Sequence, residues 1–319
     1  TVGRQLVERA MDTSEEVNPR AQIEAAEEEL YKVAAEGGDQ GEVVRWAQRA
    51  LHGIDKDSIA VKLTKAVMQI MGDGSAHCAR GDSVATHRWA AEYSHLRTDF
   101  SDASFSVVFT NPPFGAPLKI KRAEANAAGL DIAGNTPKGG DVELGLAMLN
   151  RCHQLLDDDG RLCIVLPETY YFSPSYRFVR EWTRERFVPE AVINVPMEAF
   201  AGFCRAKTNV YVFRKLPEFR DVRDASEREA KRRAARAEAS GRDVLMLNPR
   251  TCGIYKNGST RYRVDRTSGA RSKVVDNEML DHVRAWRARD PGTNQPLPPG
   301  AALVPLATTV ARDVLAPTY

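Results

Sequence analysis

The sequence predicts an α/β protein with a doubly wound parallel sheet, and two observations carry the prediction. From about residue 41 the pattern alternates between helices and short apolar strands, as in parallel sheets with helical crossovers. Three of these strands end in polar residues, at Asp55, at Gly81-Asp82 and at Asn111-Pro112-Pro113-Phe114. Because ligands of such sheets bind outside the carboxyl ends of the strands, we expect a site there.

The elements follow in order along the chain. Residues 1–40 are highly charged and predict a helical extension that starts at Asn18-Pro19 and stops at Gly37-Gly38. Further helices are expected over residues 42–50, 58–71, 141–156 and 175–187. Strands are expected over residues 51–54, 76–79, 106–110, 161–166, 190–195 and 208–214.

The character changes after residue 216, and the chain divides into five predicted parts. Residues 217–243 are rich in Arg, Glu, Asp and Ala, and their KRRAAR run indicates either a phosphate-backbone contact or a solvated helix. The parts are a helical extension (1–40), a partial catalytic core (41–216) and a charged helical insertion (217–243). A small α+β appendage (244–290) follows, and then a linker that starts a further target-recognition region (291–319).

Composition excludes several classes of protein. A hydrophobic content of 43% and a charged content of 28% are those of a soluble globular protein, and the formal net charge of +2 is too small to indicate a nucleic acid by itself. No apolar run reaches membrane-spanning length. The five cysteines form no CxxC pair, which indicates buried thiols in a reducing cytoplasm and no zinc site.

The stretch FSVVFTNPPFG is the strongest functional signal. The two prolines fix the backbone and remove amide donors, and Asn111 offers a side-chain acceptor. The Asn111 side chain and the Pro112 carbonyl can accept both hydrogens of a planar exocyclic amine while Phe114 lies on the ring face. This suits a base extruded from its stack. The alternative is a Pro-Pro turn with a core phenylalanine.

Two carboxylates precede this stretch, each at a strand end. Asp55, in HGIDKD, can accept both hydroxyls of a ribose, as acidic residues do in nucleotide-binding α/β folds. Asp82, in ARGDS, can accept from an adenine amino group. Each is a weak signal alone because aspartate is common in turns and helix caps. Their order ahead of NPPF makes the pair more specific.

Residues 41–215 resemble the class I, S-adenosylmethionine-dependent N6-adenine DNA methyltransferases, particularly the modification subunit of type I restriction–modification systems. The matching segments are HGIDKDSIAVKLTKAVMQIMGDG, CARGDS, FSVVFTNPPFG, GRLCIVLPETYYF and TNVYVFRK. The resemblance implies a Rossmann-like fold with S-adenosyl-L-methionine as cofactor and duplex DNA with a flipped adenine as substrate. It also implies a specificity subunit or target-recognition domain as partner, and methyl transfer without a metal.

Two other functions stay open. NPPF-like tetrapeptides also serve enzymes that methylate rRNA guanine N2 or a protein glutamine. The third hypothesis is an inactive scaffold that binds DNA or a partner subunit. Cofactor titration separates this scaffold from the two enzymes.

One family feature does not occur in this sequence. The family carries a loop of the form Asp/Asn-Pro-x-x-Gly-x-Gly after its first strand, and no glycine in residues 1–54 fits it. The first 38 residues instead resemble a helical segment of DnaB-type helicases. We therefore expect an incomplete sheet, with the strands ending at Asp55 and Asp82 adjacent and those ending at Asn111 and Leu166 adjacent. We also expect residues 1–319 alone to bind S-adenosylmethionine too weakly to saturate.

Overall fold

The computed structural model describes residues 47, 50–70, 77–113, 115, 118–136, 140–200, 207–265, 267–288 and 296–317. They form two units, of which the first contains the described residues up to Phe100 together with Tyr262–Val275. The second contains Ser101–Arg261 and the described residues from Asp276 onward. The predicted extension over residues 1–40 lies outside the described residues, as does Phe114.

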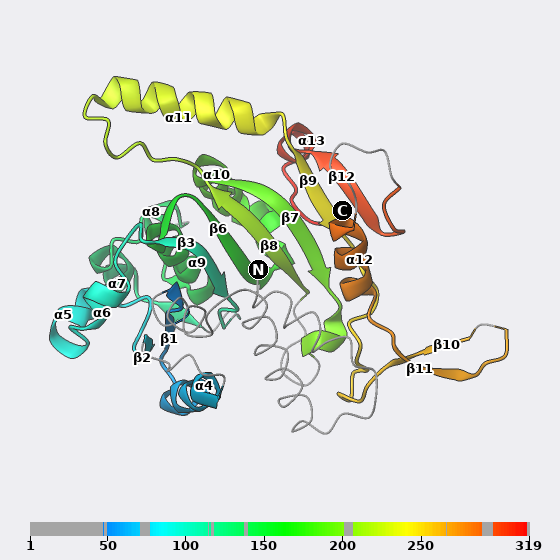
Figure 1. The fold of residues 1–319 in the computed structure, drawn as a ribbon. Coiled ribbons are helices and arrows are strands. Elements are labelled where there is room, and N and C mark those ends of the chain that lie inside the picture. The colour runs from blue at the N-terminus through cyan, green and yellow to red at the C-terminus, as the bar shows by residue number, and fades with distance from the viewer. Residues whose placement is uncertain are drawn as a thin grey trace, which may run out of the picture. The chain divides into compact units, whose positions relative to one another are not determined.

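The second unit is built on a six-stranded sheet with the strand order β12-β9-β7-β8-β6-β3 (Figure 1). Its strands are β3 (Phe105–Thr110), β6 (Leu156–Pro167), β7 (Phe187–Val195), β8 (Thr208–Lys215), β9 (Asp243–Leu247) and β12 (Ala301–Pro305). The predicted α/β class is confirmed.

The sheet is mixed, whereas the alternation of elements predicts parallel strands throughout. The pairs β3–β6 and β7–β9 are parallel, but β8 runs antiparallel to both β6 and β7, and β12 runs antiparallel to β9. The strand β8 follows β7 along the chain and pairs with it from Val195↔Thr208 to Phe187↔Lys215. Such a direct return gives an antiparallel neighbour, because a parallel one needs a crossover that brings the chain back to the starting edge.

Helices surround this sheet, and its core is apolar and aromatic. The helix α9 packs against β6 and β3, and α10 packs against β7. In β6 the alternating residues Leu162, Ile164 and Leu166 are fully buried, which is the period expected of a strand. The helices are α7 (Arg122–Ala127), α8 (Ile132–Asn135), α9 (Leu144–Leu155), α10 (Arg177–Arg186), α11 (Ala225–Ser240), α12 (Glu278–Arg287) and α13 (Leu306–Arg312).

The last described segment is part of this unit. We expected residues 244–290 as an appendage and residues 291–319 as a linker, but β9 and β12 are strands of the central sheet. The Asp313 carboxylate, just after α13, lies 2.6 Å from Arg180 Nη2 and 2.7 Å from Arg184 Nη2. The hydrogen bond from Arg180, together with Arg184, lowers the pKa of Asp313 to about 2, so this contact holds the segment on α10.

The first unit contains a small parallel sheet of β1 (Gly53–Asp55) and β2 (Cys78–Arg80). The helix α4 (Ser58–Ile70) connects them, and the Asp57 carboxylate caps it by accepting the Ile59 amide at 2.7 Å. The short helices α5 (Trp89–Glu92) and α6 (Leu96–Asp99) follow. The strands β10 (Tyr262–Val264) and β11 (Arg271–Val275) form an antiparallel hairpin.

The predicted strand neighbours are confirmed in both units. The strands that end at Asp55 and near Asp82 pair in parallel, and so do β3 and β6, which end at Asn111 and beyond Leu166. Among the described residues the two pairs belong to separate sheets. In the described part of the chain, every helix is too short or too polar to cross a membrane.

Candidate functional site

Asn111 and Pro112 lie directly after β3, at the carboxyl end of the central sheet. The neighbouring strand β6 runs parallel, with Thr110 opposite Ile164, so both strands end at the same edge. Asn111 is exposed and Pro112 is buried. The buried proline anchors the turn, and the Asn111 amide is therefore presented at the edge where ligands of α/β sheets bind.

A second polar group at this edge was missed by the sequence analysis. The Glu143 carboxylate accepts hydrogen bonds from Tyr170 Oη at 2.8 Å and from Tyr176 Oη at 2.7 Å. The chain after Asn111 leads into β4 (Lys119–Ile120), which pairs with β5 (Val142–Glu143) and places Lys119 opposite Glu143. The pair β4–β5 thus connects this carboxylate to the loop that carries Asn111.

The two tyrosines hold Glu143 as neutral donors. Tyr170 lies in the short helix Glu168–Tyr171 immediately after β6 and is 2% exposed. Burial, followed by the Glu143 charge, raises the pKa of Tyr170 above its ordinary value, and burial with the Glu143 hydrogen bond does the same for Tyr176. Both hydroxyls stay protonated at neutral pH and donate to the carboxylate. Glutamate and tyrosine at these positions follow no periodic pattern, so the sequence contained no signal for the cluster.

Buried acceptors continue along the same edge. Asn194, near the end of β7, faces Asn209 of β8 in the register, and both residues are buried. The Oδ1 atoms of both amides have no hydrogen-bond partner among the described residues. The Glu168 amide donates to the Lys207 carbonyl at 2.9 Å, which ties the end of β6 to the start of β8. This edge of the sheet is therefore rich in acceptors.

Asp55 and Asp82 lie together in the first unit. The Gly81 amide donates to the Asp55 carbonyl at 2.9 Å, so both carboxylates follow the same end of the β1–β2 pair. The Asp55 carboxylate accepts the Asp57 amide at 2.7 Å through Oδ1. A Cβ at Gly81 would come within 2.3 Å of the Leu96 Cδ1 atom, so a larger residue would require this buried side chain to shift.

The Asp82 carboxylate is more heavily occupied than that of Asp55. Its Oδ1 atom accepts the amides of Val84 and Ala85, both at 3.1 Å, and its Oδ2 atom lies 3.0 Å from Lys56 Nζ. Burial raises the pKa of Asp82, but the bonds from Lys56 and the two amides outweigh it, and the pKa is lowered. Asp82 is therefore a fixed anion, and a ligand would share it with these donors.

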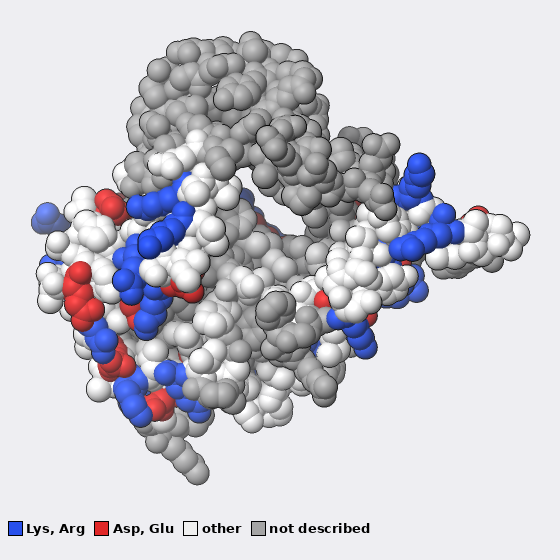
Figure 2. All heavy atoms as spheres, turned by 90° about the horizontal axis from the view of Figure 1, so that it is seen from below, with Lys and Arg blue, Asp and Glu red and all other residues white. Residues whose placement is uncertain are grey.

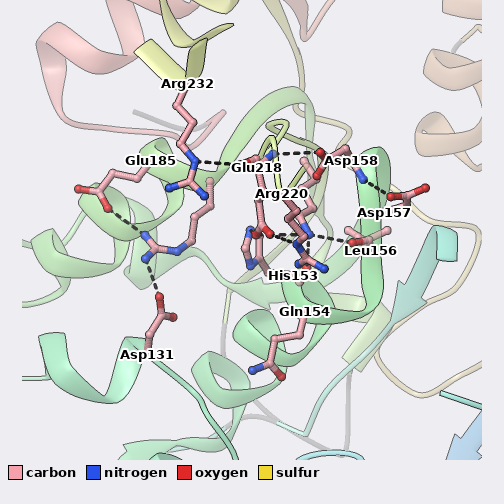
Figure 3. A network of polar contacts seen from close by, with 12 residues as sticks. Asp131, His153, Gln154, Leu156, Asp157, Asp158, Glu185, Glu218, Arg220 and Arg232 are labelled. Carbon is pink, nitrogen blue, oxygen red and sulfur yellow. Dashed lines mark hydrogen bonds and ion pairs between the residues drawn. The ribbon is translucent and has the colours of Figure 1, made fainter. Parts of the chain in front are cut away.

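Buried polar groups of the second unit also form a structural network (Figure 3). Lys215, fully buried at the end of β8, donates to the carbonyls of His153 and Leu156 at 3.0 and 2.8 Å. His153 Nε2 lies 3.3 Å from Glu218 Oε1, but burial, with the Lys215 charge, lowers the pKa of His153 to about 3. The imidazole is neutral at pH 7, so this contact is not an ion pair.

This network lies away from the Asn111 edge. Leu156 begins β6 and Lys215 ends its antiparallel neighbour β8, so the network occupies the opposite edge of the sheet. Perturbed pKa values mark structural networks as well as active sites, and here they mark the former. Among the described residues, no group of His, Cys, Asp and Glu side chains is arranged to hold a metal ion.

Similarity to known proteins agrees with this geometry. The profile of the family N-6 DNA Methylase matches residues 38–236, and the chain belongs to this family. No curated protein matches.

Two solved structures share the fold. One comes from a study of complex assembly and conformational transition in the type I restriction–modification system. It has 19% identity and a TM-score of 0.52, and the match covers 85% of this chain and 47% of that one. The other is a type I restriction–modification system methyltransferase subunit from Streptococcus thermophilus, with 16% identity, a TM-score of 0.51, and coverage of 85% and 48%. This chain thus spans about half the length of each of these two structures.

Proposed function

We propose that this chain is the catalytic core of an enzyme that transfers a methyl group from S-adenosyl-L-methionine to adenine N6 in DNA, within a cytoplasmic restriction–modification system. The observation that carries the proposal is Asn111-Pro112 at the carboxyl end of β3, with the Asn111 amide exposed and Pro112 buried. Membership of the N-6 DNA methylase family supports the choice of DNA and of a planar amine.

In this proposal Asn111 and Pro112 position the adenine amine. The Asn111 Oδ1 atom and the Pro112 carbonyl accept its two hydrogens, which orients the nitrogen lone pair. These acceptors also stabilise the positive charge that develops on the nitrogen as the new bond forms. Phe114 is proposed to stack on the base, with Pro113 fixing its backbone. S-adenosyl-L-methionine, when bound, supplies the electrophilic methyl group.

The carboxylates of the first unit fit the nucleoside part of the cofactor to different degrees. Asp55 Oδ1 accepts one backbone amide, which leaves Oδ2 as an acceptor for ribose hydroxyls. Asp82 can accept from the adenine amino group only beside Lys56, Val84 and Ala85. We propose duplex DNA with a flipped adenine as the substrate. We also propose a specificity subunit or a target-recognition domain as the partner, since this chain spans only about half of the matched structure.

Asn111→Ala tests the proposed function. In a variant whose residues 1–40 are replaced by a segment with the family's glycine-rich loop, we expect micromolar cofactor binding and N6-methyladenine in duplex DNA. Adding Asn111→Ala should lower kcat/KM by about 100- to 1000-fold, by analogy with the loss of an oxyanion-hole donor.

Asn126→Ala, at an exposed position of α7, is the matched control and should leave the rate unchanged. Mass spectrometry of digested DNA identifies the product. Unchanged activity in Asn111→Ala, or methylation of guanine in rRNA in place of DNA, would contradict the proposal.

A further inference from the structure

The hairpin β10–β11 is a strongly basic element that the proposed site does not use. Its fourteen residues, YRVDRTSGARSKVV, contain four basic side chains and one acidic side chain. Arg263, Arg271 and Lys273 are exposed, and no described residue of the hairpin is buried. Figure 2 shows basic side chains gathered over this hairpin, at the right of the view, with little acidic surface beside them.

The single carboxylate of the hairpin is used by its own turn. Asp265 Oδ1 accepts the amides of Thr267 and Ser268 at 3.0 and 2.6 Å and the Ser268 hydroxyl at 2.8 Å. Gly269 completes the turn with a φ of +70°, a conformation that favours glycine. Asp265 therefore shapes the turn, and the strands themselves present only positive charge.

One of the arginines is ordered by an aromatic ring. The Arg271 guanidinium lies 4.5 Å from the centroid of the Tyr262 ring, across the hairpin. Val264 and Val274 are about half exposed, so both strands of the ribbon are accessible.

The other basic segment, α11, is less one-sided in its charge than the hairpin. It carries five basic and three acidic residues. Lys231 pairs with Glu227 at 2.9 Å, and Arg236 pairs with Glu229 at 2.5 Å. Arg232 donates to the Glu218 carbonyl at 3.3 Å. Two of its cations pair with acidic residues of the same helix, and basic residues outnumber acidic ones by less than in the hairpin, so the KRRAAR run is the weaker candidate for a phosphate contact.

We propose that the β10–β11 hairpin binds the sugar-phosphate backbone of duplex DNA through Arg263, Arg271 and Lys273. A two-stranded ribbon fits the major groove of B-DNA, which is about 12 Å wide. Duplex DNA carries one charge per about 1.7 Å of its axis, which complements the closely spaced cations. Such contacts position a protein on DNA without reading its sequence. This inference rests on the proposed function because it takes DNA as the partner.

Salt-dependent binding tests the inference. The affinity of the full chain for a 30-base-pair duplex is measured by fluorescence anisotropy at several salt concentrations, without cofactor. The hairpin variant Arg263→Ala/Arg271→Ala/Lys273→Ala should bind at least about 10-fold more weakly at low salt. Its slope of log K against log salt should be smaller by about 2 to 3, since each phosphate contact contributes about 0.9. Two duplexes of unrelated sequence should lose equally.

The control variant Arg223→Ala/Lys231→Ala/Arg233→Ala removes the same charge from exposed positions in and before α11. It should change the affinity less than about 2-fold. The charge-preserving variant Arg263→Lys/Arg271→Lys should keep the wild-type salt slope and guards against misfolding of the hairpin. Wild-type binding by the alanine variant, an equal loss in the control, or a loss on one duplex alone would overturn the inference while leaving the proposed function standing. Failure of the wild-type chain to bind any duplex would overturn the inference, whereas the proposed function is decided separately by N6-methyladenine formation.

Discussion

The region around the six-stranded sheet and the region around the β1–β2 sheet differ in how far their apolar residues are buried. In β6, Leu162, Ile164 and Leu166 are fully buried. In α4, beside the two-stranded sheet, Ile59, Leu63 and Val67 share one helical face and are 65%, 63% and 56% exposed. The periodicity of apolar residues thus predicts a strand or a helix, but it does not predict whether other elements bury the apolar face.

The two units also differ in how densely their large side chains are packed. The second unit has a continuous sheet with β12 as one edge strand, and aromatic side chains pack in its core. The ring centroids of Phe187 and Phe213 are 5.4 Å apart, and those of Tyr211 and Phe213 are 5.6 Å apart. Among its described residues, the first unit buries few large side chains, including Trp89, Leu96 and Phe100. The proposed amine-binding residues therefore lie on the well-packed unit, and the proposed cofactor carboxylates lie on the sparsely packed one.

Matched leucine truncations give the largest expected difference between the units. Leu162→Ala in β6 removes a fully buried side chain and should lower the free energy of unfolding by about 3 kcal/mol or more, because a cavity remains. Leu63→Ala on α4 should change it by less than about 0.5 kcal/mol, because this side chain already contacts water. Urea denaturation followed by circular dichroism measures both. Equal losses would mean that α4 is covered in solution.

Lys215→Met tests the buried network of the second unit. Methionine keeps the length of the side chain but cannot donate to the His153 and Leu156 carbonyls, and Glu218 loses one of its cationic neighbours while it keeps Arg220. We expect a loss of about 2 kcal/mol of stability, since buried acceptors without partners cost about 1–3 kcal/mol. Lys62→Met, at an exposed position of α4, is the control and should cost almost nothing. A neutral Lys215→Met would show that an apolar side chain serves this position as well.

Much of this architecture could be predicted from the sequence, since local pattern determines it. The strand expected at 106–110 is observed as Phe105–Thr110, and the helix expected at 58–71 as Ser58–Ile70. Prolines and an asparagine after a strand also suffice to indicate a site, because strand ends are where such sheets bind ligands.

The pairing of β12 could not be predicted. The strand β12 joins β9 across more than fifty residues, and no local pattern specifies that register. Lysine is expected at the surface, so the sequence did not indicate that Lys215 is buried. The contacts of Glu143 with Tyr170 and Tyr176 depend on three separate elements, and only the fold brings them together.

The pH dependence of stability distinguishes the units further. Burial and the charges of Lys215 and Arg186 lower the pKa of His153 to about 3, against the opposing effect of Glu218 and Asp131. The unfolded chain therefore binds a proton below pH 6.5 that the folded chain does not bind. Stability should fall as the pH drops from about 6.5 towards 3, by at most about 1.4 kcal/mol per pH unit from this group.

His153→Gln should flatten the dependence between pH 6.5 and pH 5. In that range the carboxylates with lowered pKa values, such as Glu218, are still ionised in both states and contribute little. Urea titrations of the wild type and the variant at half-unit pH intervals give the slope. An identical slope in both proteins would show that His153 binds its proton in the folded state.

Asp82→Asn in the first unit should have the smallest effect on stability. The amide Oδ1 can still accept from Val84 and Ala85, so the change removes mainly the charge interaction with Lys56. That lysine side chain is 81% exposed, and surface pairs of this kind contribute about 0–1 kcal/mol. Because the pKa of Asp82 is lowered, its charge stabilises the fold fully above the ordinary aspartate pKa, and this contribution is lost as the pH falls below it. Asp82→Ala also removes the acceptor of two turn amides and should cost about 1 kcal/mol more. A loss above about 2 kcal/mol for Asp82→Asn in urea denaturation at pH 7 would show that the first unit depends on this carboxylate as strongly as the second depends on Lys215.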